Sequence, residues 1–568
     1  MMTPTPDPAE WLSNLFKSQP DMLQRFGTDR PGSAAASDAA VPAQWQEFSN
    51  KLNALQQDYF RQIATLWPWP AAAPAGTAAA QDKRFAGEAW RADPRLEMAT
   101  RSYLVYSGLL RGAIDAAPLD EQSKSQWGFA ARQLVDAMSP ANFLATNPDA
   151  MQLVLETGGQ SPVEGMGLLV QDLLKGRITM TDETAFELGR NVATTPGSVI
   201  FENELMQLIR YTPLTPQVHK HPLLMVPPCI NKFYILDLQP DNSLVRYALE
   251  QGHMVFMVSW RNATPEMGKL TWDDYLQSGV TKAIDVALEV SGAEKLNALG
   301  FCLGGTLLSC AVAVMKPADK DRVASLTLLT TMLDFVDTGE LGLLVTEQSV
   351  ASREEAIGTQ GVMRGADLSL AFSSLRANDL IWPYVVNSYL KGKAPPAFDL
   401  LYWNSDATNL PGPMYCWYLR NMYLENRLRE PGQTVHCGVP LDLANLDMPA
   451  YLYASREDHI VPWRTAYASR WLLGGEATFV LGASGHIAGV INPASKNKRN
   501  HWVGTGAKCD ADEWLAGAAD VPGSWWPNWS AWLARHAGPM VAVPEAPARS
   551  PYRPIEAAPG RYVKEKAE

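Results

Sequence analysis

The sequence has few cysteines and no long apolar run. Only six of its 568 residues are cysteine, and none stands in a C-x-x-C pair. This scatter argues against a disulfide framework or a cysteine zinc site, and it fits a reducing cytoplasm. No uninterrupted apolar run reaches the roughly 18 residues of a membrane span, and the polar, proline-rich beginning has no basic-then-apolar signal pattern. We therefore expect a cytoplasmic protein with no transmembrane segment.

An excess of basic residues is also lacking. The chain has 48 Lys and Arg against 60 Asp and Glu, a formal net charge of −12. This balance argues against a general nucleic-acid binder, and an anionic substrate would need a local basic patch. The composition, 46% hydrophobic and 19% charged, is that of a globular protein, and the length allows two or three domains. The 19 tryptophans suggest an apolar ligand or surface, although large cores also use Trp.

The composition and the pattern of apolar residues change along the chain. We expect a mobile segment at 1–80, a mostly helical domain at 81–190, a catalytic α/β domain at 191–540 and a disordered tail at 541–568. The mobile segment ends in a Pro/Ala-rich linker. Before that linker, apolar residues recur every three or four positions and predict one stripe of an amphipathic helix: Trp45, Phe48, Leu52, Leu55, Tyr59, Ile63 and Leu66. The stripe fits either packing on the main body or docking on a partner helix or hydrophobic particle.

From about residue 195, short apolar strands alternate with helical segments. Strands are expected at 223–226, 253–258, 296–301, 324–329, 450–454 and 477–481. Continuous apolar strands in such an alternation predict a parallel sheet covered by helices. Residues 335–440, rich in aromatics and Pro-Gly turns, interrupt the pattern and are expected to form a lid.

One potential nucleophile lies between glycines where an apolar strand ends. The stretch Gly300-Phe301-Cys302-Leu303-Gly304 fits the nucleophile elbow of α/β-hydrolases, with Cys in place of Ser. Glycines are needed there because the strand-to-helix turn is sharp. The following helix N-terminus would favour a thiolate. Alternatively, Cys302 is a buried structural cysteine in a glycine-rich turn.

Two later strands end at an acid and a histidine. Asp458 comes after the strand at 450–454, and His486 comes after the strand at 477–481. The order Cys302, Asp458, His486 is the nucleophile-acid-histidine order of the α/β-hydrolase fold. His486 is expected to take the thiol proton, and Asp458 to orient its ring.

The same fold predicts where the oxyanion donors lie. The backbone N–H of Leu303 would supply one, and the N–H of Ile230, in the loop after the 223–226 strand, a second. Cys229 is expected to serve packing. From the residues alone, His459 fits a site hydrogen bond or a loop cap equally well.

Long motifs give the chain a resemblance to class I polyhydroxyalkanoate synthases. The matching segments include these: Phe85-Ala86-Gly87-Glu88-Ala89-Trp90, Pro227-Pro228-Cys229-Ile230-Asn231-Lys232, Asp458-His459-Ile460-Val461-Pro462-Trp463 and Gly485-His486-Ile487-Ala488-Gly489-Val490. The resemblance implies a helical N-terminal domain and an α/β-hydrolase domain with a lid. It also implies polymerisation of short-chain (R)-3-hydroxyacyl-CoA through a Cys302 thioester, with no metal or redox cofactor.

Further expectations come from the resemblance alone. It implies that Arg376, His459 and Asn231 are substrate-binding residues, with Arg376 on the CoA side. It connects Trp403 with packing in a homodimer. It also implies a location on polyester granules and a possible phasin-like coat protein as partner. On this basis, the apolar stripe at 45–66 and the Trp-rich segment near 525–532 would face the granule.

Three other functions fit parts of the sequence. A Cys-dependent hydrolase of the dienelactone-hydrolase type shares the elbow, but predicts neither a lid nor an N-terminal helical domain. An acyl-CoA thioesterase would use the same nucleophile with water as acceptor. A structural granule-coat protein would need no triad.

Overall fold

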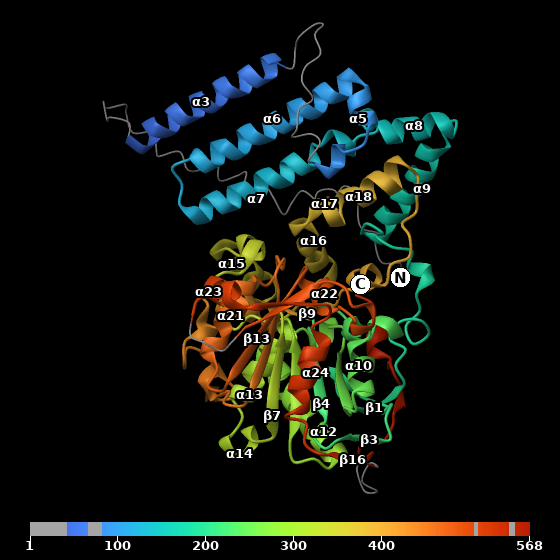
Figure 1. The fold of residues 1–568 in the computed structure, drawn as a ribbon, viewed down its shortest axis with the longest axis vertical. Coiled ribbons are helices and arrows are strands. Elements are labelled where there is room, and N and C mark those ends of the chain that lie inside the picture. The colour runs from blue at the N-terminus through green and yellow to red at the C-terminus, as the bar shows by residue number, and fades with distance from the viewer. Residues whose placement is uncertain (1–42, 66–81, 505–508, 545–550, 568) are drawn as a thin grey trace. The chain divides into compact units, whose positions relative to one another are not determined.

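The structure is a computed structural model that describes residues 43–65, 82–504, 509–544 and 551–567 (Figure 1). Its contacts divide the chain into two units. The first comprises the residues up to Asp182 together with 370–396, and the second comprises 183–369 and 397–568. The apolar stripe's last residue, Leu66, lies outside the described residues.

The first unit is helical. Its helices before residue 182 are these: α3 (Ala43–Thr65), α5 (Ala89–Ala92), α6 (Pro94–Ala116), α7 (Glu121–Ala137), α8 (Pro148–Glu156) and α9 (Gln160–Lys175). Side chains cap three of them, because Asp93, Asp120 and Asn147 accept hydrogen bonds from backbone N–H groups of the first turn. Helices α3, α6 and α7 lie side by side (Figure 1).

The apolar stripe of α3 packs inside this unit. Phe48, Leu52, Leu55, Tyr59 and Ile63 are half-buried. A Cβ added at Gly112 of α6 would lie 2.9 Å from a Leu55 methyl carbon, so that the two helices are in close contact. Trp45 remains 50% exposed. These contacts favour the packing interpretation of the stripe over a free docking face.

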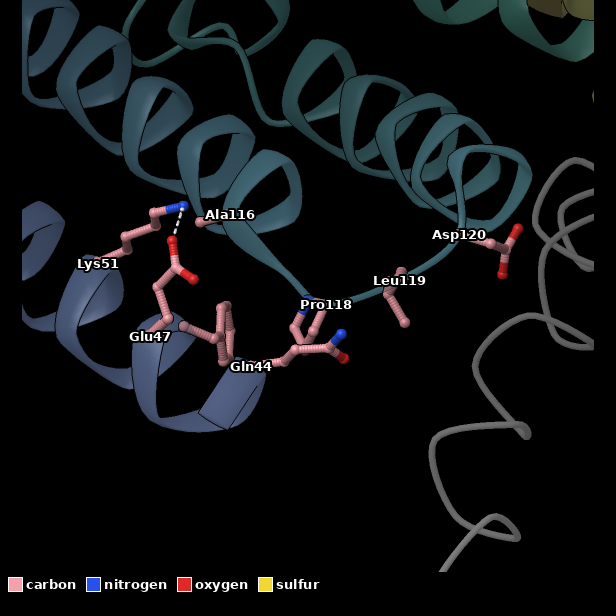
Figure 2. A pocket seen from close by; sticks show the side chains of 8 residues that line it. Gln44, Glu47, Lys51, Ala116, Pro118, Leu119 and Asp120 are labelled. Atoms are coloured by element: carbon pink, nitrogen blue, oxygen red, sulfur yellow. Dashed lines mark ion pairs between the residues drawn. The ribbon is translucent and has the colours of Figure 1, made fainter. Parts of the chain in front are cut away.

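A pocket of about 420 Å³ lies where α3 begins, beside the connection between α6 and α7 (Figure 2). Glu47 and Lys51 of α3 form an ion pair of 2.8 Å within its lining. Leu119 and Asp120 line the opposite side. The lining has no cysteine, serine or histidine, and we assign it no chemistry.

Residues 370–396 belong to the first unit, although we expected the whole of 335–440 to be part of the catalytic domain. They contain α17 (Ala377–Leu380), α18 (Trp382–Tyr384) and η9 (Val385–Leu390). The Tyr389 hydroxyl donates to Asp172 of α9 at 2.7 Å. Gly165 of α9 allows the close approach, since a Cβ there would lie 2.1 Å from the Tyr389 carbonyl oxygen.

The second unit is built on an eleven-stranded sheet. Its strand order is β15-β14-β13-β12-β7-β6-β4-β5-β2-β1-β17. The six strands from β13 to β5 are parallel, as the sequence predicts, and antiparallel strands extend the sheet at both edges. The strand bounds are these: β1 (Gly197–Glu202), β2 (Met206–Tyr211), β4 (Leu223–Val226), β5 (Val255–Trp260), β6 (Leu296–Phe301), β7 (Val323–Leu329), β12 (Ala450–Ser455), β13 (Ala477–Gly482), β14 (Asn500–Val503), β15 (Ala519–Pro522) and β17 (Glu556–Ala557).

Two hydrophobic cores lie on the two faces of this sheet. Alternate residues of β4 divide between them, with Leu224 and Val226 in one core and Leu223 and Met225 in the other. Helices α12 (Lys282–Ser291) and α13 (Leu303–Ala313) cover the first face, and α10 (Leu244–Glu250) and α24 (Trp526–Ala534) cover the second.

An insertion separates β7 from β12. Outside residues 370–396, it contains α15 (Glu347–Ile357), α19 (Asp399–Asn404), α20 (Gly412–Tyr418) and η10 (Leu419–Leu424). Two short two-stranded sheets, β8 (Val362–Met363) with β9 (Leu410–Pro411) and β10 (Val435–His436) with β11 (Val439–Pro440), complete it.

The expectation of a disordered tail at 541–568 is wrong for the residues described there. Strand β16 (Met540–Ala542) pairs with β3 (Gln217–His219), and β17 pairs with β1 at the edge of the main sheet. Tyr562 and Val563 are buried. The composition misled the prediction because two short strand pairings and two core side chains are enough to anchor the segment.

The Trp-rich segment near 525–532 is not a surface for a granule. Trp525, Trp526, Trp529 and Trp532 are all at most 4% exposed and belong to the second core. The indole N–H groups of Trp525 and Trp526 donate to the carbonyls of Gly489 and Val490. These tryptophans therefore hold another segment of the chain in place.

Substituting Gly165 by Ala should destabilise the first unit. The new methyl group would overlap the Tyr389 carbonyl, and such overpacking costs about 1–3 kcal/mol of unfolding free energy. Gly167, in the same helix, has no atom within 4 Å of an added Cβ. Gly167→Ala should therefore stabilise by about 0.5–1 kcal/mol through helix propensity. Denaturant unfolding compares the two variants, and equal stabilities would contradict the close packing of α9 on η9.

Candidate active site

The predicted elbow is present at the end of β6. Cys302 adopts φ 52° and ψ −126°, between the last residue of β6 and the first residue of α13. This positive φ is strained for a residue with a side chain. Its backbone is held on both sides, because its N–H donates to the Leu329 carbonyl at 2.9 Å and its carbonyl accepts from Gly305 at 2.9 Å. The Cys302 side chain therefore sits at the N-terminus of α13, half-buried.

Glycines make this turn possible by allowing backbones to approach. A Cβ at Gly300 would lie 2.3 Å from the Cα of Gly305. One at Gly304 would lie 2.2 Å from the Val226 carbonyl and 2.5 Å from the Pro227 carbonyl. The start of α13 is thus in direct contact with the loop after β4, where we predict the second oxyanion donor.

Asp458 and His486 meet beyond the carboxyl ends of β12 and β13. His486 Nδ1 and Asp458 Oδ2 are 2.6 Å apart, and both residues are buried. The other carboxylate oxygen of Asp458 accepts from the N–H groups of Ile460 and Val461, each at 2.9 Å. With both oxygens bound, the carboxylate is fixed in position and can orient the imidazole.

Cys302 also acts on His486. Burial alone would lower the pKa of His486, but the Asp458 carboxylate and Cys302 outweigh it and raise the pKa to about 10. The structure therefore brings Cys302, Asp458 and His486 together, with a direct hydrogen bond between Asp458 and His486. Its imidazole can be charged at neutral pH.

Side chains from other segments hold the short helix that begins at His486. Trp525 and Trp526 bind its carbonyls at Gly489 and Val490, and the Phe301 ring stacks on the imidazole with centroids 5.7 Å apart. Ser484, two residues earlier, has φ 82°, so that the approach to the histidine is strained. The sequence could not show this support, because the tryptophans lie some 40 residues away.

The predicted oxyanion loop lies beside the elbow. Burial raises the pKa of the Cys229 thiol, and the nearby Cys302 adds to this rise. Cys229 is 1% exposed, which fits the expected packing role. The carbonyl of Ile230 accepts from the Thr408 N–H at 3.1 Å, and Asn231 forms a β-bridge with Ala407. Leu303 is the first residue of α13, where backbone N–H groups have no acceptor within the helix.

The other predicted binding residues are more widely distributed. His459 comes directly after Asp458 and is half-buried, with its carbonyl facing Gly339. Arg376 belongs to the first unit, where it precedes α17 and binds Asp379 with an Nε–Oδ2 distance of 2.8 Å. Trp403 is 4% exposed, and its indole N–H donates to the Lys232 carbonyl at 2.7 Å. It therefore packs inside this chain.

Two tyrosines of the insertion were missed by the sequence analysis. The rings of Tyr418 and Tyr423 pack edge to face with centroids 5.3 Å apart, and burial raises the pKa of both phenols. The Cys302 sulfur contributes to both shifts, and Asp458 contributes to that of Tyr423. Two neutral hydroxyl groups thus lie near the Cys302 sulfur. Only the aromatic richness of the insertion pointed to them.

In the described part of the chain, no cluster of three or more His, Cys, Asp or Glu side chains is arranged to hold a metal ion. None of the described helices is both long and apolar enough to cross a bilayer.

Comparisons with known proteins agree with this architecture. Residues 81–248 match the family model described as the N-terminus of poly-beta-hydroxybutyrate polymerase (PhaC). Residues 222–493 match the model of the alpha/beta hydrolase fold. The expected fold class is confirmed.

Three curated relatives are similar over most of their length. The poly(3-hydroxyalkanoate) polymerase subunit PhaC of Cupriavidus necator is 52% identical over 583 residues, covering 100% of this chain and 97% of that protein. The protein of the same description from Rhizobium meliloti is 40% identical, covering 86% of this chain and 80% of that protein. A poly(3-hydroxyalkanoate) polymerase of Methylorubrum extorquens is 42% identical, covering 86% and 81%. The chain therefore belongs to the poly(3-hydroxyalkanoate) polymerase family and is an acyltransferase-type enzyme with the α/β-hydrolase fold.

Proposed function

We propose that this enzyme polymerises short-chain (R)-3-hydroxyacyl-CoA, such as 3-hydroxybutyryl-CoA, by covalent catalysis on Cys302. The observation that supports the proposal most directly is the 2.6 Å contact of His486 with Asp458 in a group that includes the Cys302 sulfur. An acyl carrier needs a nucleophile, a base for its proton and an orienting acid, and the three side chains have those capacities.

In the first step, the Cys302 sulfur attacks the carbonyl of the acyl-CoA thioester. His486 holds the thiol proton, and the carbonyl oxygen becomes an oxyanion. The N–H of Leu303 at the start of α13 and the N–H of Ile230 are the donors we propose for that oxyanion. As the tetrahedral intermediate collapses, CoA leaves as a thiolate and takes the proton from His486. The acyl group stays on sulfur.

In the second step, the 3-hydroxyl of another acyl unit attacks the Cys302 thioester. His486 takes the hydroxyl proton and returns it to the departing sulfur, and one ester bond replaces one thioester bond. Asp458 stabilises the imidazolium each time it forms. A sulfur nucleophile suits this exchange because the enzyme thioester and the CoA thioester have similar energies.

Other parts of the proposal come from the family resemblance. Arg376, His459 and Asn231 would contact the substrate, with the Arg376 guanidinium suited to CoA phosphates. A class I homodimer at the granule surface, with a phasin-like coat protein as a possible partner, completes the proposal. No metal or redox cofactor enters either step.

Cys302→Ala should abolish CoA release from 3-hydroxybutyryl-CoA, lowering the rate roughly 10⁴-fold or more because the acyl carrier is lost. Cys437→Ser is the matched control, since Cys437 is exposed, and it should keep wild-type activity. Thiol titration measures the released CoA, and product analysis separates polymer from free acid. Free 3-hydroxybutyrate as the product would identify a thioesterase instead, and turnover by Cys302→Ala would contradict the nucleophile assignment.

Asp458→Asn should reduce stability in a pH-dependent way. The folded protein raises the pKa of His486 from 6.5 to about 10. The resulting stabilisation is complete below pH 6.5 and is lost as the pH rises through the folded pKa. Because the substitution removes the carboxylate that raises this pKa, its penalty in unfolding free energy should shrink between pH 6.5 and pH 9.5. Urea unfolding at the two pH values measures it.

A surface carboxylate provides the control for this measurement. Asp512 pairs with Arg464, which lowers the pKa of Asp512. It stays ionised from pH 6.5 upward in both states, and Asp512→Asn should therefore have the same effect at both pH values. An Asp458→Asn penalty that is constant or grows toward pH 9.5 would contradict the charged pair.

A further inference from the structure

A buried lysine lies just beyond the proposed oxyanion donor in the loop after β4. Lys232 is 2% exposed and lies two residues after Ile230. Burial lowers the pKa of Lys232 to about 8, although the nearby Asp406 carboxylate opposes this effect. A buried ammonium group needs acceptors, and a buried charge without a partner is strongly destabilising. The positions of these acceptors therefore influence the position of the loop after β4.

The acceptor of Lys232 comes from the far end of the chain. Its Nζ donates to the backbone carbonyl of Glu565 at 2.7 Å. The next residue, Lys566, forms an ion pair of 2.9 Å with Asp406, whose other oxygen accepts from the Tyr234 hydroxyl at 3.0 Å. Residues 565 and 566 thus supply one acceptor and one cation to a largely buried cluster.

The C-terminal segment that provides this acceptor is itself fastened to the sheet. Tyr562 and Val563 are buried, and the Tyr562 hydroxyl donates to the Asn203 carbonyl at 2.8 Å. The Asn262 side-chain amide donates to the Lys566 carbonyl at 3.1 Å. The carbonyl that binds Lys232 is therefore held at a defined place beside the ends of β2 and β5.

The opposite side of the loop is bound by the insertion. The Lys232 carbonyl accepts from Trp403, and the Ile230 carbonyl accepts from the Thr408 N–H. Residues 230–232 are thus held between residues 403–408 and the C-terminal segment. Just before these residues, the Val226 and Pro227 carbonyls contact Gly304, two residues after Cys302.

We infer that residues 562–567 are a positioning element of the active site, which binds the Lys232 ammonium and holds the Ile230 N–H where it can bind the oxyanion. The inference rests on the proposed function. It predicts that one reaction of the Cys302 sulfur depends on this loop and that another does not. Attack of the sulfur on a thioester carbonyl forms an oxyanion and needs the loop. Alkylation of the same sulfur by iodoacetamide forms none, and depends only on Cys302 and His486.

The test is a chain that ends at Lys564. It lacks the Glu565 carbonyl and Lys566 but keeps the buried Tyr562 and Val563. Single-turnover acylation by 3-hydroxybutyryl-CoA, measured as CoA release with enzyme in excess, should slow roughly 10- to 100-fold, because a misplaced donor stabilises the oxyanion poorly. The alkylation rate of Cys302 by iodoacetamide should stay at the wild-type value.

Lys232→Met in the full-length chain tests the same contact from the other side. It should show the same selective loss, and combining it with the truncation should cause little further loss, because both changes remove one interaction. Arg561→Gln is the matched control. Arg561 lies directly before residues 562–567 but pairs with Glu202 and Glu556, and its substitution should leave acylation unchanged.

The outcomes separate the inference from the proposed function. If the truncated chain does not fold, Lys232→Met decides the question alone. Wild-type acylation rates in folded variants, or equal losses of acylation and alkylation, would overturn the inference while leaving the proposed function intact. A wild-type chain that releases no CoA would overturn both.

Discussion

The backbone of Cys302 is the constraint on which the site depends. A non-glycine residue at φ 52° is disfavoured, typically by about 1–3 kcal/mol, and persists only where its surroundings over-determine it. Here the surroundings are β6, paired on both sides within the sheet, and α13, which contacts the β4 loop at Gly304. The strain exposes the sulfur at a helix N-terminus and at the carboxyl edge of the sheet. There the segments after β12 and β13 bring Asp458 and His486 together.

Environment distinguishes this cysteine from the others near it. Cys229 and Cys310 are fully buried, and burial raises the pKa of each thiol, which leaves them unreactive. Cys302 instead is half-buried near His486, whose own pKa is raised because Asp458 and Cys302 outweigh the burial. The same buried interior thus raises the pKa of two thiols, whereas the third lies beside a histidine that is paired with a carboxylate.

The side chains that surround and support the candidate site come from segments that are distant in the sequence. The tryptophans after residue 524 hold the helix of His486, and two tyrosines of the insertion lie near the sulfur. The final residues contact the loop beside the elbow through Lys232. The indole N–H groups and the Lys232 ammonium are polar groups that burial would otherwise leave without a partner, and this requirement connects distant segments to the candidate site.

The sequence alone determined the elbow, the order of Cys302, Asp458 and His486, and the parallel sheet, because each depends on local patterns: glycine spacing, apolar runs and the residues at their carboxyl ends. Only the tertiary structure decided the positions of the Trp525–Trp526 cluster, the α3 stripe and the C-terminal segment. The sequence alone does not show whether an apolar side chain lies on a surface or in a core. Likewise, the short strand β17 and the single carbonyl of Glu565 gain their roles only from distant partners, β1 and Lys232, which no local pattern reveals.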